Sequence, residues 1–531
     1  MFWFIAIAGA LTLISYYCYF KPFSYWKKLG VKQISSPWIF LGDFWPVFIG
    51  KMNFSDLMDT FYFKRPTARY DALYHLSIPT LIIRDPKLIK QMLVKDFDHF
   101  TDHVNIAPSE DPDGLWSQNL LSLKGNKWRE MRSVLSGTFT SSKMRFMYTL
   151  ILDASESFTN YFLEKDVDFI EVELKESFTR FTTDVIATTA FGLKVDSMKD
   201  PQNKFYLMGK EATDFTGITV VIKFFLTFFF PWLFRQLKIG FFSHRVTNFF
   251  NDLIDDTLKI REEQGIERPD VLHLLLQLKK RASIEEPEPA GTDDHDIVKE
   301  TLETVKAQKT PIQITNRDIA AQAVAFFIAG FDSVTTAMCF TTYELAVNPN
   351  IQDKLRKEIE DTLENHNGRI TYETLLGMKY LDVVVTESLR KWPAIPATDR
   401  ECVKPYTINS TNPEEKSITL LPDQRILIPI VSIHHDPKYY PEPEKFIPER
   451  FSDENKSNIH PYTYLPFGVG PRGCIGFRLA LLETKSILFH LLKNFEIVPT
   501  EKTTIPLKLS KKTLVVSVEG GFPFGLKRIR N

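Results

Sequence analysis

The segment from Phe467 to Gly476 constrains this chain more than any other. It reads Phe-Gly-Val-Gly-Pro-Arg-Gly-Cys-Ile-Gly and places one cysteine, Cys474, among glycines, with Arg472 two residues before it. Glycine lets a backbone turn tightly and approach a flat ligand closely. Backbone N–H groups and the start of the helix expected just after the loop favour a thiolate. The alternative is a glycine-rich surface loop with a buried free cysteine, but the spacing F-x-x-G-x-R-x-C-x-G is too specific for chance.

Charge and cysteine content exclude several classes of protein. Lys plus Arg (65) nearly balance Asp plus Glu (66) over 531 residues, which argues against nucleic-acid binding by bulk charge. Hydrophobic residues make up 44% of the chain, so a large core is expected. The four cysteines are far apart and form no C-x-x-C pair, so neither a disulfide framework nor a zinc site is expected. They are Cys18, Cys339, Cys402 and Cys474.

The N-terminus predicts a membrane anchor. Residues 2–20 carry no charge and are long enough, at about 1.5 Å per residue, to span a hydrocarbon layer. Lys21, Lys27 and Lys28 follow and place the rest of the chain in the cytosol, with Tyr25 and Trp26 as expected interface anchors. A cleaved signal peptide is the rival, but no basic n-region or small-residue cleavage site is present. We therefore expect an anchor over 1–20, a connector over 21–50 and one catalytic domain over 51–531.

Helical periodicity dominates after short strands expected at about residues 75–85. A second apolar run, Ile218 to Phe234, has three readings: a second membrane span, an internal helix, or a surface hairpin that dips into the membrane. Ala282 to Lys309 is rich in Glu, Asp, Pro and Thr and predicts a solvated connector within one domain.

A long apolar helix is predicted from Asn316 to Val347, ended by Asn348-Pro349. Its centre carries Gly330, Asp332 and Ser333. A glycine costs about 1 kcal/mol in a helix relative to alanine, and an unpaired acid in an apolar helix costs more. Such residues are tolerated where they serve a site; the alternative is a helix–helix contact with a satisfied polar pair.

Three shorter motifs are ordinary in isolation. Trp128 and Arg132 lie one helical turn apart, as do Glu387 and Arg390, and Arg450 lies in the segment Phe-Ile-Pro-Glu-Arg-Phe. Each alone is typical of a solvated helix face or a surface ion pair.

Together, in this order, these motifs resemble the cytochrome P450 family of haem-thiolate monooxygenases, from about residue 20 to residue 525. The resemblance implies a mostly α fold with a small β-rich part near the N-terminus (α+β). It also implies haem b with Cys474 as axial thiolate ligand to the iron. Other short segments, such as Trp-Arg-Glu-Met-Arg, resemble those of insect microsomal families six and nine, and of family nine more closely.

The resemblance also assigns roles to site residues. Trp128, Arg132, Arg400 and Arg472 would contact the haem propionates, Phe467 would pack near the sulfur, and Gly476 would complete the loop. Gly330 would let the helix approach the haem, while Asp332 and Ser333 would pass protons to the reacting oxygen; the family usually has threonine at the latter position. Glu387, Arg390 and Arg450 would form a buried structural charge cluster. His434 and His435 are expected to be structural or propionate-side groups rather than axial ligands.

The implied function is insertion of one oxygen atom into apolar molecules such as plant toxins, insecticides or endogenous lipids. No G-x-G-x-x-G follows a strand, so electrons must come from a partner protein. The family resemblance implies that this partner is an NADPH–cytochrome P450 reductase, with cytochrome b5 as a further partner, at the endoplasmic reticulum membrane. Five basic residues are candidates for a docking surface for this partner, and the alternative is a merely solvated basic face. They are Lys124, Lys127, Arg129, Lys143 and Arg145.

The substrate cavity is expected at residues 103–121, 215–221, 325–333, 394–398 and 522–524. The alternatives are a haem-thiolate isomerase or dehydratase and a non-catalytic haem carrier or sensor.

Overall fold

The computed structural model describes residues 22–35, 37–38, 41–104, 114–214, 240–266, 268, 270–282, 314–411, 415–511 and 516–530, with the single positions 9, 226, 236 and 237. The predicted anchor over residues 1–20, apart from position 9, lies outside these residues. So do nearly all of the apolar run 218–234 and of the connector 282–309.

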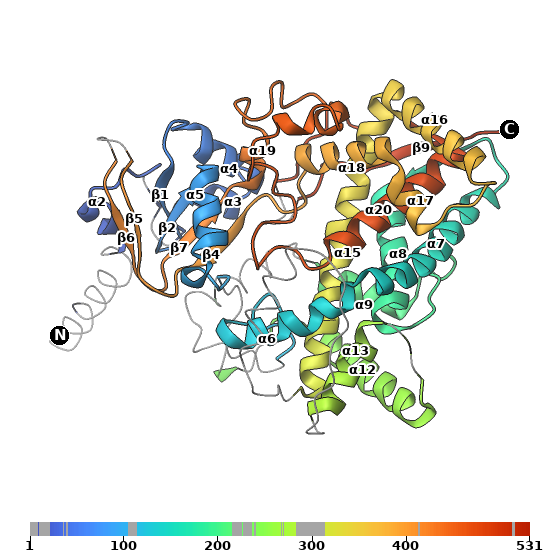
Figure 1. The fold of residues 1–531 in the computed structure, drawn as a ribbon, viewed down its shortest axis with the longest axis horizontal. Coiled ribbons are helices and arrows are strands. Elements are labelled where there is room, and N and C mark those ends of the chain that lie inside the picture. Colours follow the sequence, from blue (N-terminus) through green and yellow to red (C-terminus); the bar gives the residue numbers. More distant parts are fainter. Residues whose placement is uncertain are drawn as a thin grey trace.

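Helices form the larger part of the molecule and gather on the side away from the first sheet (Figure 1). Several begin at side-chain caps, as where Asn53 accepts the N–H of Asp56 and Ser243 accepts that of Val246. The helices are α2 Tyr25–Leu29, α3 Trp45–Phe48, α4 Phe54–Phe63, α5 Pro86–Lys90, α6 Gly125–Ser136, α7 Ser141–Leu163, α8 Leu174–Ile186, α9 Lys204–Ala212, α12 His244–Gln264, α13 Val271–Ala282, α15 Asn316–Val347, α16 Pro349–Asn365, α17 Tyr372–Gly377, α18 Lys379–Lys391, α19 Ile430–His434 and α20 Phe477–Asn494.

The strands form one four-stranded sheet and two smaller ones. The four-stranded sheet has the order β1-β2-β7-β4, in which β2 pairs with β7 in parallel and the other two pairs are antiparallel. The strands are β1 Tyr70–His75, β2 Ile78–Ile83, β3 Phe169–Glu173, β4 Thr398–Glu401, β5 Tyr406–Ile408, β6 Ile418–Leu420, β7 Arg425–Ile428, β8 Phe495–Pro499 and β9 Pro523–Arg528. The β-rich part predicted near the N-terminus therefore takes half of its strands from residues 398–428, because parallel pairing joins segments distant in sequence.

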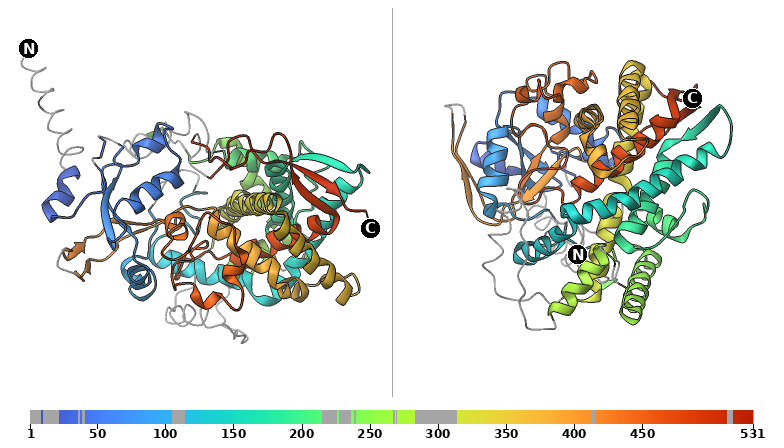
Figure 2. Two further views of the ribbon diagram at one scale, coloured as in Figure 1. Left: turned by 90° about the horizontal axis from the view of Figure 1, so that it is seen from above. Right: turned by 45° about the vertical axis from the view of Figure 1, so that its right-hand side comes forward.

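Helix α15 has the predicted bounds and runs through the middle of the helical part (Figures 1 and 2). Thr315 and Asp318 form a reciprocal capping box at its start. It is the one described helix long and apolar enough to cross a membrane, but most of its apolar window is buried inside the fold.

Two large apolar clusters meet along α15. Its first half, from Ile319 to Phe331, packs with α6, α9, α12 and α13, and its second half, from Val334, packs with α7, α18 and α20. Asp332 and Ser333 lie between these halves, at the boundary of the two clusters. The polar break in the helix thus coincides with a break in the apolar core.

The segment expected to be a connector is partly packed on the sheet. Trp26 is fully buried and its indole N–H donates to the carbonyl of Leu73 at 3.0 Å. The prediction that Trp26 is a membrane-interface anchor is therefore wrong, because its ring is enclosed by the protein and its polar edge is satisfied there.

Candidate active site

The cysteine loop is fixed by its own backbone. Cys474 donates its N–H to Phe467 O at 2.8 Å, and Gly473 donates to Gly470 O at 2.8 Å. Gly470 has a φ of 75°, and a Cβ there would collide with the carbonyl oxygen of Leu93. A side chain at position 470 would therefore push the loop away from the backbone of Leu93, and only glycine fits.

The thiol of Cys474 is reachable by solvent although protein surrounds it on most sides. Burial raises its pKa, while the backbone N–H of Gly476 and the charge of Arg132 favour the thiolate. Gly476 immediately precedes α20, so the helix dipole acts in the same direction. These three contributions oppose the effect of burial, which still leaves the pKa of the Cys474 thiol above its ordinary value.

Helix α6 brings Trp128 and Arg132 to this loop. Arg132 donates to Gly473 O at 2.8 Å, and the guanidinium of Arg472 lies 4.0 Å from the centre of the Trp128 ring. Burial lowers the pKa of Arg132 to about 10. No carboxylate of the described residues forms an ion pair with Arg132. A buried guanidinium without a carboxylate partner favours the binding of an anion beside it.

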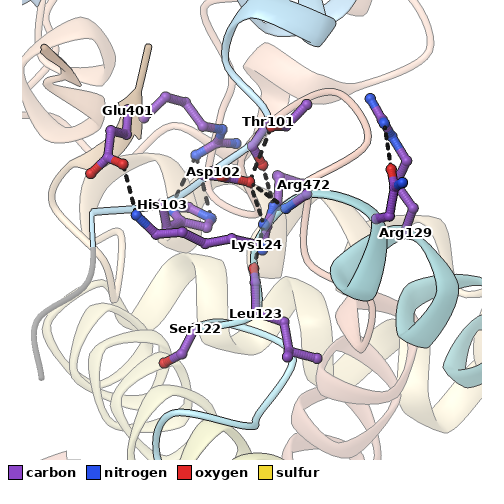
Figure 3. Close-up of polar contacts among 12 residues, drawn as sticks. Thr101, Asp102, His103, Ser122, Leu123, Lys124, Arg129, Glu401 and Arg472 are labelled. Atoms are coloured by element: carbon purple, nitrogen blue, oxygen red, sulfur yellow. Dashed lines mark hydrogen bonds and ion pairs between the residues drawn. The ribbon is translucent and has the colours of Figure 1, made fainter. Parts of the chain in front are cut away.

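Arg472 acts as a clamp on the preceding chain (Figure 3). It donates to Thr101 O at 2.7 Å and Leu123 O at 2.7 Å, and its Nη2 lies 3.5 Å from Asp102 Oδ1. Burial, with Arg400 nearby, lowers the pKa of Arg472 to about 9. Because the donors of Arg472 already bind backbone carbonyls, Arg472 would attract a bound anion mainly through its positive charge.

Arg400 on β4 is fully buried and its Nε has no hydrogen-bond partner among the described residues. Its Nη1 contacts Thr398 Oγ1 at 3.1 Å and the His103 ring at 3.4 Å. Burial alone would raise the pKa of Asp399, but His103 and the N–H of Val104 hold it at about 2. The pKa of Arg400 falls to about 10 through burial.

One face of α15 is open where the rest of the helix is buried. Ala329 is exposed, Phe326 and Ser333 are half-buried, and these positions fall on one side of the helix. Ser333 donates to Ala329 O at 2.5 Å, so its hydroxyl stays against its own helix. Phe139 links this face to the cysteine loop, since its ring lies 5.8 Å from that of Phe326 and a Cβ on Gly476 would lie 3.9 Å from it.

Gly330 and Asp332 border that face and both approach α8. A Cβ at Gly330 would lie 2.9 Å from Ile186 of α8, so the missing side chain serves helix packing; its expected role in the approach to a haem stays a prediction. Asp332 lies 3.6 Å from Lys175 Nζ, also on α8.

Glu387, Arg390 and Arg450 are brought together behind the loop. Arg390 makes two bonds to the Glu387 carboxylate, at 2.7 and 2.9 Å, and Arg450 Nε lies 3.3 Å from Glu387 Oε1. His434 is buried, and its ring nitrogens contact Arg390 O at 3.0 Å and the N–H of Leu465 at 2.8 Å. This cluster ties α18 to the segments that carry the cysteine loop and does not contact Cys474.

The expected cavity segments differ in accessibility. Residues 394–395 and 397–398 and the face of α15 near Ala329 are accessible, whereas 105–113 and 215–221 lie outside the described residues. Phe522 and Phe524 are 3% and 1% exposed and pack in the core, Phe522 at 5.3 Å from the Phe340 ring. Their expected place in the cavity wall is not supported, because the hairpin that carries them packs on the second half of α15.

Some of the candidate docking residues form ion pairs with acidic side chains of this chain. Arg129 pairs with Asp98, Lys124 with Glu401 and Arg145 with Glu373. Among the described residues no ion pair involves Lys127 or Lys143. These two lysines carry the uncompensated part of the surface.

The chain belongs to the cytochrome P450 family, whose model matches residues 45–523. Members of this family are haem-thiolate monooxygenases that hold haem b through a cysteine thiolate, and the fold described above is theirs. The chain is 44% identical to cytochrome P450 9e2 of Blattella germanica over 93% of its own length and 92% of that protein. It is 38% identical to probable cytochrome P450 9f2 of Drosophila melanogaster, with 94% of each chain covered. It is 36% identical to cytochrome P450 6k1 of Blattella germanica, with 98% and 96% covered. The expected kinship with insect families six and nine is confirmed.

The residues at the site fit haem b. Cys474 supplies one accessible sulfur, the open face of α15 is apolar, and Arg132 and the free Nε of Arg400 provide positive charge for an anionic edge. Sequence reasoning missed Lys175, Asp399 and Phe139. Their contacts join segments far apart in the chain and follow no fixed spacing, so no local signal marks them.

Proposed function

We propose that Cys474 would hold the haem iron, that the open face of α15 would border the same site, and that this chain oxidises apolar small molecules with electrons from a reductase. The observation that supports this most strongly is the accessible thiol of Cys474, fixed by the Phe467 and Gly473 contacts and stabilised as thiolate by Gly476 and Arg132. Arg132 and Arg400 would bind the propionates, with Trp128 and the charge of Arg472 beside them.

When bound, a thiolate-ligated haem supplies activation of dioxygen by two electrons and two protons. The chain itself orients the substrate and moves protons. The open side of α15 presents Phe326 and Ala329 and excludes charge from the reacting space. Ser333 keeps a hydroxyl at this face, and Asp332, held by Lys175, is one residue away and exchanges protons with water.

Family membership implies a reductase partner and small-molecule substrates. We propose specifically an NADPH–cytochrome P450 reductase, with cytochrome b5 as a second donor. We also propose anchoring by residues 1–20 in the endoplasmic reticulum membrane with residues 51–531 in the cytosol. Lys127 and Lys143 are the charges best placed for docking, because they are not paired within the described chain.

The test is the reduced, carbon-monoxide difference spectrum of membranes that contain the wild type or Cys474→Ser. A strongly red-shifted Soret band in the wild type and its loss in the variant are expected. An imidazole-like band in the wild type would contradict the assignment of Cys474. NADPH consumption with purified reductase then separates a monooxygenase from an isomerase or dehydratase, which needs no reductase, and from a haem carrier. The retained Asp332 and Ser333 favour the monooxygenase.

A further inference from the structure

Gln322 of α15 has no solvent-exposed surface, and both ends of its amide bind the backbone of another segment. Its Oε1 accepts the N–H of Leu120 at 2.8 Å, and its Nε2 donates to Gln118 O at 2.7 Å. A buried amide left without partners destabilises the fold, so these bonds fix the segment strongly. Nothing in the cysteine or Asp332 chemistry uses this residue.

Arg472 of the cysteine loop also binds the segment that Gln322 contacts. Arg472 donates to Leu120 O at 3.2 Å and to Leu123 O at 2.7 Å. Leu120 therefore gives its N–H to α15 and its carbonyl to the cysteine loop. Asn119 holds the turn between them, since its Oδ1 accepts the N–H groups of Leu121 and Ser122 at 3.0 Å each.

Gln322 shares its helix face with the open part of α15. Positions 322, 326, 329 and 333 are separated by four, three and four residues and so lie along one side. Segment 118–120 consequently covers the N-terminal end of the face that Phe326, Ala329 and Ser333 leave accessible. Its upstream part is anchored as well, because Trp116 is buried and stacks on Phe241 with ring centres 4.1 Å apart.

We propose that Gln322 is a positioning residue that pre-organises segment 114–123 as a wall of the substrate space, through the link Gln322–Leu120–Arg472. This rests on the proposed function, in which the open face of α15 lies above the haem. A fixed wall improves the binding of large ligands by removing the cost of ordering it. A ligand small enough to contact only the iron gains nothing from the wall.

Two measurements on the full-length, haem-loaded protein test the proposal. Hydrogen exchange reports the backbone N–H groups of residues 118–123, and Soret titrations report the dissociation constants of imidazole and of clotrimazole, a triaryl imidazole. The variants are Gln322→Leu, which removes both bonds, and Gln322→Glu, whose protonated form restores a donor and an acceptor. Gln352→Leu is the matched control, since Gln352 is also buried and binds the N–H and carbonyl of Ile497 at 2.8 and 2.9 Å, away from this segment.

In Gln322→Leu we expect exchange at Leu120 to rise at least tenfold and clotrimazole affinity to fall at least fivefold relative to imidazole. Gln322→Glu should recover towards wild type as the pH is lowered. Gln352→Leu should raise exchange at residues 495–499 and leave the affinity ratio unchanged. Unchanged hydrogen exchange at residues 118–123 in Gln322→Leu would overturn the proposed link Gln322–Leu120–Arg472, whether or not the haem chemistry is as proposed. A ratio of clotrimazole to imidazole affinity equal to that of Gln352→Leu would overturn the role of Gln322 in ligand binding. A wild type without a thiolate-type carbon-monoxide band would instead refute the proposed function.

Discussion

At the scale of single residues, exposure and contacts determine what the polar side chains at the centre of α15 can do. Asp332 is half-exposed and lies 3.6 Å from Lys175, so it stays near water and a cation. Ser333 binds the carbonyl of Ala329 and points along the open face. The acid and the hydroxyl are therefore adjacent in sequence, but one lies near Lys175 and the other binds its own helix, so we expect water to carry a proton between them.

Asp332→Asn tests this role. The amide keeps the size of the side chain but exchanges no proton, so product formed per NADPH should fall by about 10- to 100-fold. The carbon-monoxide spectrum should stay as in the wild type, which separates proton delivery from haem binding. Ser333→Thr is the companion variant and should retain activity, because it keeps the hydroxyl and restricts its rotamers. Equal coupling in Asp332→Asn and wild type would contradict the assignment.

At the scale of elements, the cysteine loop is held by the helices that flank it. Helix α20 starts directly after Gly476 and is buried along most of its length. Helix α18 is joined by Arg390 to the carbonyls of His434 and Pro443, at 3.0 and 2.8 Å. The geometry at the sulfur thus depends on contacts made well away from it.

Arg390→Met should destabilise the fold by about 3–5 kcal/mol, because it leaves the Glu387 carboxylate buried without its closest cation. Thermal unfolding followed by circular dichroism measures this, and haem content should fall in parallel. Lys379→Met is the control at the start of the same helix; its ion pair with Asp453 is exposed and contributes little. A melting temperature as high as that of the control would contradict a structural role for the cluster.

Glu483 on α20 makes stability depend on pH. It is 2% exposed, its Oε2 has no partner among the described residues, and burial raises its pKa to about 8. The folded protein therefore holds a proton that the unfolded chain releases near its ordinary value of 4.5. Stability from this group is full below the unfolded pKa and is lost as the pH rises towards about 8.

Glu483→Gln should accordingly match the wild type at pH 5 and exceed it in melting temperature at pH 8. Melting curves from pH 5 to pH 8 measure the effect, with the exposed Glu360→Gln on α16 as control. Parallel curves for wild type and Glu483→Gln would show that this carboxyl is not neutral in the folded state.

At the scale of the whole molecule, the surface around α6 lies over the cysteine loop, on the side of Trp128 and Arg132. Three of its five candidate cations are paired with acids, which leaves Lys127 and Lys143 to attract an acidic partner. The distribution of charge, rather than the number of basic residues, sets the strength of such a surface.

Lys127→Glu should weaken reductase binding about three- to tenfold at low ionic strength and less at high salt, where charges are screened. Lys357→Glu on α16 makes the same charge change on a distant helix and should leave the affinity unchanged (Figure 1). The affinity is measured from the dependence of NADPH oxidation on reductase concentration. An equal effect of the two substitutions at low salt would contradict docking at α6.

The sequence by itself determined the long helix Asn316–Val347, the cysteine loop and the family, because helix periodicity, capping and short motifs are local properties of the chain. It also placed Glu387, Arg390 and Arg450 in one cluster through the family resemblance. Only the tertiary structure decided that Trp26 is buried, that Gly330 faces Ile186, and that Arg472 binds carbonyls of residues 101–123. It also revealed Gln322 and Lys175 as partners of distant segments. These facts depend on the rotation of one helix against another and on contacts between segments distant in the chain, and no spacing within the sequence encodes them.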